Sequence, residues 1–176
     1  MNVNIKKLHE DAEMPKYAHE GDAGVDLVAI EDVIIEPGET ALVKTGLAFE
    51  LPDGYEMMIR PRSGITLKTK LRVQLGTVDS HFRGEVGVIV DNTANFADLF
   101  DIPTIEDFYV IYGIDGRYYC GTNNIKEGGG YIIRKGDRIA QAVIAPVSRA
   151  QFTEVETLGE TARGVGGFGS SGVSAE

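Results

Sequence analysis

The chain has 176 residues, a formal net charge of −10 and a single cysteine, Cys120. This length suits one domain with its own core, and one cysteine excludes both a disulfide framework and a multi-cysteine zinc site. The acidic balance argues against nucleic-acid partners, and the lack of a long apolar run or leader argues against a membrane partner, so we expect a cytoplasmic protein.

Strands are predicted along most of the chain. Val- and Ile-rich segments of about four to eight residues are separated by Pro-Gly, Asp-Gly or Lys-Gly pairs. In chain order, the expected strands cover 32–36, 40–51, 55–60, 71–78, 86–92, 131–134 and 138–147. A short helical stretch is predicted near 62–70, and no longer segment has apolar residues at helical spacing. The pattern indicates an all-β sandwich or jelly roll.

Two regions depart from this pattern. Residues 95–130 mix acidic and aromatic side chains with Asp-Gly and Gly-Gly-Gly turns, so we expect an inserted hairpin or small subdomain between two core strands. From Gly164 to Gly172, every residue except Val165 and Phe168 is glycine or serine. Such a segment cannot fold alone. The expected organisation is a β domain over 1–162, which includes the insertion, and a flexible arm over 163–176.

Five short segments contain the residues best suited to chemistry. They cover 23–27, 62–64, 76–85, 136–141 and 163–172. A hairpin at 76–85 would offer backbone groups to the edge of a planar ligand, with Phe82 on the ligand's face and Asp79 nearby as a base. Arg62, Ser63 and Gly64 precede the helical turn, where amides and a hydroxyl can bind an anion. The arm combines bare amides, hydroxyls and Arg163, which together can wrap a phosphate.

Each segment also has an ordinary structural explanation. Ser63 suits a helix cap, and acids such as Asp26 and Asp79 are more often turn formers or paired surface charges than catalysts. Gln141 lies in an apolar run and needs a hydrogen-bond partner, which a purely structural contact would supply. A Gly/Ser-rich chain end is commonly a solubilising tail.

Taken together and in this order, the five segments resemble the five motifs of the homotrimeric deoxyuridine triphosphatases (dUTPases). The resemblance extends over nearly the whole chain except 95–130. It implies a distorted jelly-roll homotrimer that hydrolyses dUTP to dUMP and pyrophosphate, with each active site assembled from all three subunits. Such an enzyme limits uracil incorporation into DNA and supplies dUMP for dTMP synthesis.

The resemblance also implies roles for individual residues around the base and the metal. Asp79 would orient and activate the water that attacks the α-phosphorus. Phe82, in place of the family's tyrosine, would stack on the deoxyribose, which requires the ring and not its hydroxyl. Main-chain groups of the hairpin, including Gly76 and Val78, would recognise uracil. Mg²⁺ would be bound through the phosphates and water, with Asp26 holding its water ligands.

Further residues are implied to contact the phosphates or to cover the substrate. On the α- and β-phosphates these are Arg62, Ser63 and Gly64, with Gln141 from another subunit. From the arm, Arg163, Ser170 and Ser171 would close on the γ-phosphate, while Phe168, followed by Gly169, would cover the uracil.

Several positions differ from the family's pattern. Val73 and Gln74 lie where many members have an asparagine that touches uracil, so base recognition would depend more on backbone groups. Asp22 stands where serine or threonine is common, and His81 replaces a frequent aspartate in the hairpin turn. We interpret His81 as a solvated turn residue rather than a catalyst.

Two other functions are alternatives. Certain phage enzymes of this family carry an extra segment at the place of 95–130, and some bind a repressor, so a regulatory protein that captures a repressor through the insertion is one alternative. A solvated hairpin that only decorates the trimer would explain the same composition. The other alternative is dCTP deaminase, which needs a buried acid beside the pyrimidine amino group. Glu85 is the one candidate for that acid in the hairpin.

Overall fold

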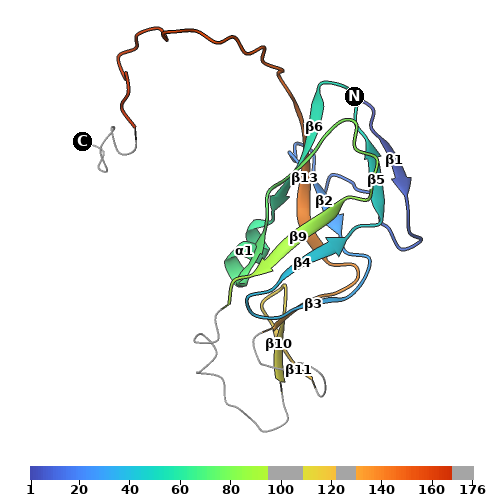
Figure 1. Ribbon diagram of the computed structural model, residues 1–176. Helices are drawn as coiled ribbons and strands as arrows, with labels where there is room; N and C mark the ends of the chain where they lie inside the picture. The colour runs from blue at the N-terminus through green and yellow to red at the C-terminus, as the bar shows by residue number, and fades with distance from the viewer. Residues whose placement is uncertain (95–108, 122–129, 168–176) are drawn as a thin grey trace.

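The computed structural model describes residues 1–94, 109–121 and 130–167, and these residues form strands joined by turns and one short helix (Figure 1). The all-β class is therefore confirmed. The elements are β1 Asn4–Lys7, β2 Val25–Val28, β3 Val33–Ile35, β4 Thr40–Lys44, β5 Leu47–Glu50, β6 Tyr55–Pro61, α1 Ser63–Lys68, β7 Leu71–Val73, β8 Gly76–Val78, β9 Gly87–Asn92, β10 Tyr109–Gly113, β11 Tyr118–Gly121, β12 Gly130–Ile133 and β13 Arg138–Pro146.

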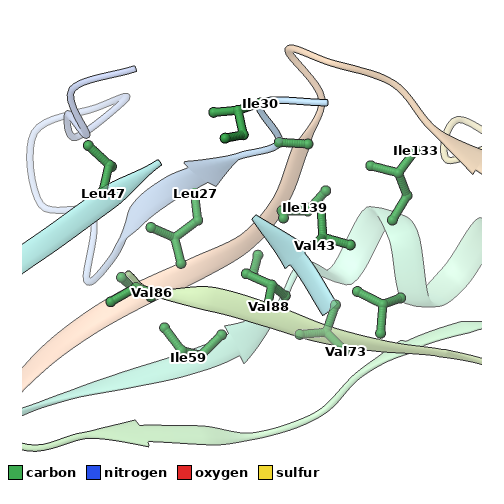
Figure 2. Close-up of a cluster of buried hydrophobic side chains, with 14 of the residues drawn as sticks. Leu27, Ile30, Val43, Leu47, Ile59, Val73, Val86, Val88, Ile133 and Ile139 are labelled. Atoms are coloured by element: carbon green, nitrogen blue, oxygen red, sulfur yellow. The ribbon is translucent and has the colours of Figure 1, made fainter. Parts of the chain in front are cut away.

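The strands form four sheets around a common apolar core. Two four-stranded sheets have the orders β2-β13-β6-β8 and β11-β10-β12-β3, while β4-β9-β7 and β1-β5 form smaller sheets. Val43 and Val88 from one sheet pack with Leu27 and Ile139 from another, and all four side chains are almost completely buried (Figure 2). Burial of these apolar faces is the main stabilising contribution to the fold.

The prediction of a single strand over 40–51 is wrong, because the chain turns at Thr45 and Gly46 and forms two strands there. β4 pairs with β9, whereas β5 pairs with β1, a strand outside the expected set. Gly46 has a φ of 66°, and a Cβ atom there would lie 2.8 Å from the Cβ of Ala12. Only glycine combines this left-handed backbone with so close an approach. The apolar pattern continues across the turn and therefore did not reveal it.

The strand expected over 71–78 is also divided, and this division opens the hairpin at 76–85. β7 pairs with β9, and the pairing ends where the amide of Gln74 donates to the carbonyl of Ile89 (2.9 Å). β8 then pairs with β6, while the amide of Val86 on the opposite arm donates to the carbonyl of Leu47 (2.8 Å). The hairpin is thus paired at its base, and its arms diverge toward the tip.

The expected inserted hairpin is confirmed for residues 109–121, although it is not a separate subdomain. β10 and β11 are antiparallel neighbours, and β10 also runs parallel to β12, so the hairpin extends a sheet of the main domain. Ile111 is buried, and the rings of Tyr112 and Tyr131 lie 5.7 Å apart. The remaining residues of the insertion, 95–108 and 122–129, lie outside the described part of the chain.

After β13 the chain leaves the body of the domain as an extended segment (Figure 1). Phe152 and Leu158 on this segment are 93% and 87% exposed. Large apolar side chains on an extended segment have no core of their own to join. α1, the one helix in the described part, is far too short to span a bilayer.

Candidate active site

A cavity of about 480 Å³ lies where the end of β6 meets the start of β13. The β6–β13 pairing sets Gln141 opposite Arg60, so Gln141 lies beside the chain as it passes from β6 into α1. The predicted phosphate-binding residues Arg62, Ser63, Gly64 and Gln141 therefore line one cavity of a single copy, so the expectation that Gln141 comes from another subunit is wrong. Its remaining lining residues are Ile65, Lys68, Ile114, Asp115, Gly136, Asp137 and Arg138.

Asp26 holds the arginines of this cavity in place. Its carboxylate contacts Arg62 Nε at 3.0 Å and Arg138 Nη1 at 3.4 Å, and the Asp26 side chain is only 17% exposed. Arg62 Nη1 also donates to the carbonyl of Arg138 at 3.0 Å. These charge-assisted contacts fix the Arg62 guanidinium before any ligand arrives. Asp26 is thus a partner of arginine in this structure, and its water-mediated metal role stays a prediction.

The turn between β12 and β13 forms another wall of the cavity and is anchored at several points. Asp137 accepts a hydrogen bond from the amide of Arg134 (2.8 Å), and Asp32 accepts one from the amide of Lys135 (2.7 Å). The Lys135 ammonium contacts Asp11 at 2.7 Å, and this hydrogen bond lowers the pKa of the Asp11 carboxyl. Glycine at position 136, with a φ of 90°, permits the turn.

The hairpin tip carries Asp79 and Phe82. The Phe82 ring lies over Gly84, where a Cβ atom would be 2.6 Å from the ring, and Phe82 is 45% exposed. The amide of Phe82 donates to the main-chain carbonyl of Asp79 at 3.1 Å. The Asp79 carboxylate is exposed and has no hydrogen-bond or ion-pair partner among the described residues. His81 Nε2 lies 2.9 Å from the Asp53 carboxylate, which links the tip to the turn before β6.

The strand register places the two groups of site residues at opposite ends of β6. Gly76 is opposite Ile59 and Val78 is opposite Met57. Asp79, the next residue, therefore lies near Glu56 at the start of β6. Arg62 follows the last residue of the strand, Pro61. At about 3.3 Å per residue, roughly 20 Å of backbone separates Asp79 from Arg62 in one copy of the chain. The structure does not bring these two residues together.

The arm residues are not brought to the cavity either. Arg163 Nε donates to the carbonyl of Gly166 at 2.9 Å, within a local turn of the extended segment. Phe168, Gly169, Ser170 and Ser171 lie outside the described residues.

The departures from the motif pattern have structural explanations. Val73 is buried in the core, and the side-chain amide of Gln74 donates to the Asp91 carboxylate, so neither residue presents a free amide at the hairpin. Asp22 accepts a hydrogen bond from the amide of His19 (2.8 Å). Glu85 Oε1 accepts one from the amide of Gly46 (2.8 Å), which assigns this acid a structural contact rather than the deaminase role.

Sequence reasoning gave no role to Lys68, Asp115, Asp137 or Arg138, although all four line the cavity. Asp137 and Arg138 belong to the 136–141 segment, in which only Gln141 was assigned. No motif points to Lys68 or Asp115. These two residues line one cavity only because the inserted hairpin packs against α1.

Comparison with known proteins identifies the family. The dUTPase family model matches residues 10–105 and 127–172. A deoxyuridine 5′-triphosphate nucleotidohydrolase of Nautilia profundicola is 44% identical over 174 residues, which covers 98% of this chain and 99% of the relative. The enzyme of the same name from a Picosynechococcus species is 41% identical with the same coverage.

Solved structures agree with this assignment. A Staphylococcus bacteriophage 80α dUTPase mutant with dUpNHpp is 34% identical, covers 98% of this chain and 99% of its own, and superposes with a TM-score of 0.86. A dUTPase mutant of phage φ11 of S. aureus, described with a structural Mg(II) ion, is 31% identical over 89% of this chain and 98% of its own, with a TM-score of 0.79. These likenesses confirm the distorted jelly roll.

The insertion is visible in the same comparisons. Residues 106–126 fall between the two ranges matched by the family model, which narrows the predicted insertion of 95–130. The two bacterial relatives nevertheless align over 98% of the chain and nearly all of their own length. An added segment of this size is therefore not confined to phage proteins. From its motifs, its fold and these full-length relatives, the chain belongs to the dUTPase family.

Proposed function

We propose that the chain hydrolyses dUTP to dUMP and pyrophosphate by in-line attack of water on the α-phosphorus, in active sites shared between copies. The observation that carries this proposal is the placement of Asp79 and Arg62 at opposite ends of β6. Asp79 from one copy would then act on a triphosphate held by Arg62 of another copy. The reaction would limit uracil incorporation into DNA and supply dUMP for dTMP synthesis.

On the phosphate side, binding depends on groups that are already fixed. Arg62, oriented by Asp26, would pair with the α- and β-phosphates. Ser63 and Gly64 would add a hydroxyl and a main-chain amide, and Gln141 would add its side-chain amide. Fixed donors of this kind stabilise the charge that develops in phosphoryl transfer without a cost of reorganisation at the moment of reaction.

On the base side, the hairpin would position the uracil, the sugar and the water. The Asp79 carboxylate has no partner among the described residues, so it is free to accept a hydrogen bond from the attacking water. Phe82 offers a half-exposed ring for the deoxyribose. Where the hairpin arms diverge, main-chain groups of Gly76 and Val78 would recognise uracil.

The residues present fit a magnesium ion that arrives with the triphosphate. In the described part of the chain, no three His, Cys, Asp or Glu side chains gather as a set of metal ligands. Mg²⁺ commonly keeps several waters and binds through substrate phosphates, where it neutralises charge on the phosphoryl oxygens. Asp26, which contacts two arginines of the cavity and is 17% exposed, would accept hydrogen bonds from the water ligands of the ion.

A homotrimer with a closing arm would complete the site. The segment 147–167 leaves the domain with Phe152 and Leu158 exposed, as expected for a segment that packs on another copy (Figure 1). From a domain ending near residue 162, the arm would extend over the neighbouring site. There Arg163, Ser170 and Ser171 would contact the γ-phosphate, and Phe168 and Gly169 would cover the base. Closure would also exclude water from the triphosphate.

Hydrolysis in ¹⁸O-labelled water tests the proposed reaction directly. Attack on the α-phosphorus puts the label into dUMP, whereas attack on the β-phosphorus puts it into pyrophosphate. Mass spectrometry of the two products distinguishes these outcomes, and label in pyrophosphate would reject the mechanism. Ammonia release from dCTP, measured in parallel, would instead support the deaminase alternative.

A regulatory function is the second candidate, and the description of one phage neighbour motivates it. One related structure, a mutant of the phage 80α dUTPase, is described in connection with a SaPI-inducing capacity. In the present chain, the inserted hairpin presents Tyr118, which is 74% exposed and suits a protein interface. Tyr118→Ala should weaken capture of a phage-island repressor, measured by release of that repressor from its operator DNA, while dUTP turnover is retained. Equal capture by both proteins would remove the hairpin from this role.

A further inference from the structure

Lys68, in the last turn of α1, lines the same cavity as the predicted phosphate-binding residues. Ile114 and Asp115, from the turn of the inserted hairpin, also line this cavity. The inserted segment and the end of α1 therefore meet at the cavity.

The three cations that line this cavity differ in how their charge is compensated. Arg62 and Arg138 share the carboxylate of Asp26, at 3.0 and 3.4 Å. The Lys68 ammonium has no hydrogen-bond or ion-pair partner in the described part of the chain. Lys68 is therefore the lining cation whose charge is left for an anionic ligand.

The two acids in the cavity wall do not neutralise Lys68, because both are engaged elsewhere. Asp115 contacts Arg117 Nε at 3.4 Å and accepts a hydrogen bond from the Arg117 amide at 3.0 Å. Asp137 accepts one from the amide of Arg134. A triphosphate in the cavity would thus meet Lys68 without displacing a protein carboxylate.

The inserted hairpin packs directly on the backbone of Lys68. Gly116 has a φ of 80°, and a Cβ atom there would lie 3.2 Å from the carbonyl oxygen of Lys68 and 3.4 Å from its Cβ. This contact fixes the C-terminal end of a helix that is about 9 Å long and begins at Ser63. Lys68 is thereby held at the far end of α1 from Ser63, a separation comparable with the length of an extended triphosphate.

We propose that Lys68 is a further substrate-binding residue, which contacts a distal phosphate of dUTP and is positioned by the inserted β10–β11 turn. The inference rests on the proposed placement of the α- and β-phosphates at Arg62, Ser63 and Gly64. It gives the insertion a role in the hydrolytic site itself.

Steady-state kinetics of Lys68→Gln test the contact. KM for dUTP and the inhibition constant for pyrophosphate should rise about five- to tenfold, since a charged hydrogen bond is lost at a partly exposed site. The inhibition constant for dUMP, which lacks the distal phosphates, and kcat should change less than about twofold. Lys68→Arg should restore most of the affinity. Lys70→Gln, the same charge change two residues along and outside the cavity lining, is the matched control.

Gly116→Ala tests the positioning role of the insertion. The added methyl group meets the Lys68 backbone, so KM for dUTP should rise about two- to fivefold, whereas it should not rise further in the background of Lys68→Gln. Gly38→Ala is the control, because Gly38 has the same φ of 80° and no atom within 4 Å of its added Cβ. An equal effect of both alanine variants would assign the change to backbone strain and reject the positioning role.

Two results would overturn the Lys68 contact. One is an unchanged KM for dUTP in Lys68→Gln. The other is a rise that dUMP inhibition or Lys70→Gln shares, which would indicate a general structural effect. Arg62→Gln distinguishes failure of this inference from failure of the proposed site. A raised KM in Arg62→Gln alone rejects only the Lys68 contact, while no effect in either variant rejects the placement of the phosphates.

Discussion

The two ends of β6 differ in how firmly the structure holds their candidate site residues. At the end that leads into α1, Asp26 pairs with two arginines, the β12–β13 turn is anchored by Asp11 and Asp32, and side chains line an open cavity. At the other end, the hairpin tip presents a half-exposed Phe82 and an exposed Asp79.

We propose that this difference reflects the half of the reaction that each end serves. A fixed, positively charged cavity binds an anion without reorganisation, whereas an exposed carboxylate and ring must be covered before they exclude water. Within one copy, roughly 20 Å of backbone along β6 keeps the halves apart. We therefore expect that the exposed tip of one copy works against the cavity of another.

The largest expected effect is that of Asp79→Asn. Removing the proposed base should lower kcat by about a thousandfold, while the dissociation constant of a non-hydrolysable dUTP analogue changes by less than about threefold. Steady-state kinetics measure kcat, and isothermal titration calorimetry measures the dissociation constant. Asp53→Asn, which changes the acid that contacts His81 of the tip from the turn before β6, should retain most of kcat. Normal turnover in Asp79→Asn would remove Asp79 from its proposed role.

Mixed assemblies test whether the two ends act across copies. Asp79→Asn and Arg62→Gln are each impaired at every site, but in mixed trimers about a quarter of the sites would combine an intact Asp79 with an intact Arg62 from different chains. Co-expression with two affinity tags, followed by measurement of kcat/KM, should therefore recover activity well above either parent. Activity equal to that of the parents would show that both residues act within one chain.

Arg62→Gln alone should have a smaller effect, because it weakens binding at the preformed end. KM for dUTP should rise about 10- to 100-fold as a charge-assisted contact with phosphate is lost. Asp26 keeps its contact with Arg138, so the melting temperature should change little. Arg60→Gln, two residues earlier on β6, is the control for charge. If both substitutions raise KM equally, the effect is one of overall charge and not of the cavity.

The smallest effect concerns the anchor between Asp11 and Lys135. The hydrogen bond from Lys135 lowers the pKa of Asp11, so its contribution to stability is present above the carboxyl's ordinary pKa and is lost as the pH falls through the lowered value. Asp11→Asn should lower the melting temperature slightly at pH 7, and the difference should be smaller at a pH of about 3, below the carboxyl's ordinary pKa. Thermal melts of both proteins at the two pH values measure this. A difference of the same size in acid would contradict the linkage.

Local sequence signals predicted much of the fold and the composition of the cavity. Strand positions follow from apolar alternation and turn residues, and Arg62, Ser63 and Gly64 do line a cavity, which Gln141 joins from the same copy and not, as expected, from another. The divided strands were missed, because a sheet change at Gly46 depends on its close approach to Ala12 rather than on local preference. Lys68 was missed because its neighbours in the cavity include residues more than 40 positions away in the chain.

The parallel pairing of β10 with β12 limits how this enzyme can be shortened. Without β10, one side of β12 would present unpaired backbone donors and acceptors, and the core would lose Ile111. An exposed strand edge readily recruits other chains and promotes aggregation. A shortened version of the protein should therefore keep residues 109–121, even if the rest of the inserted segment is removed.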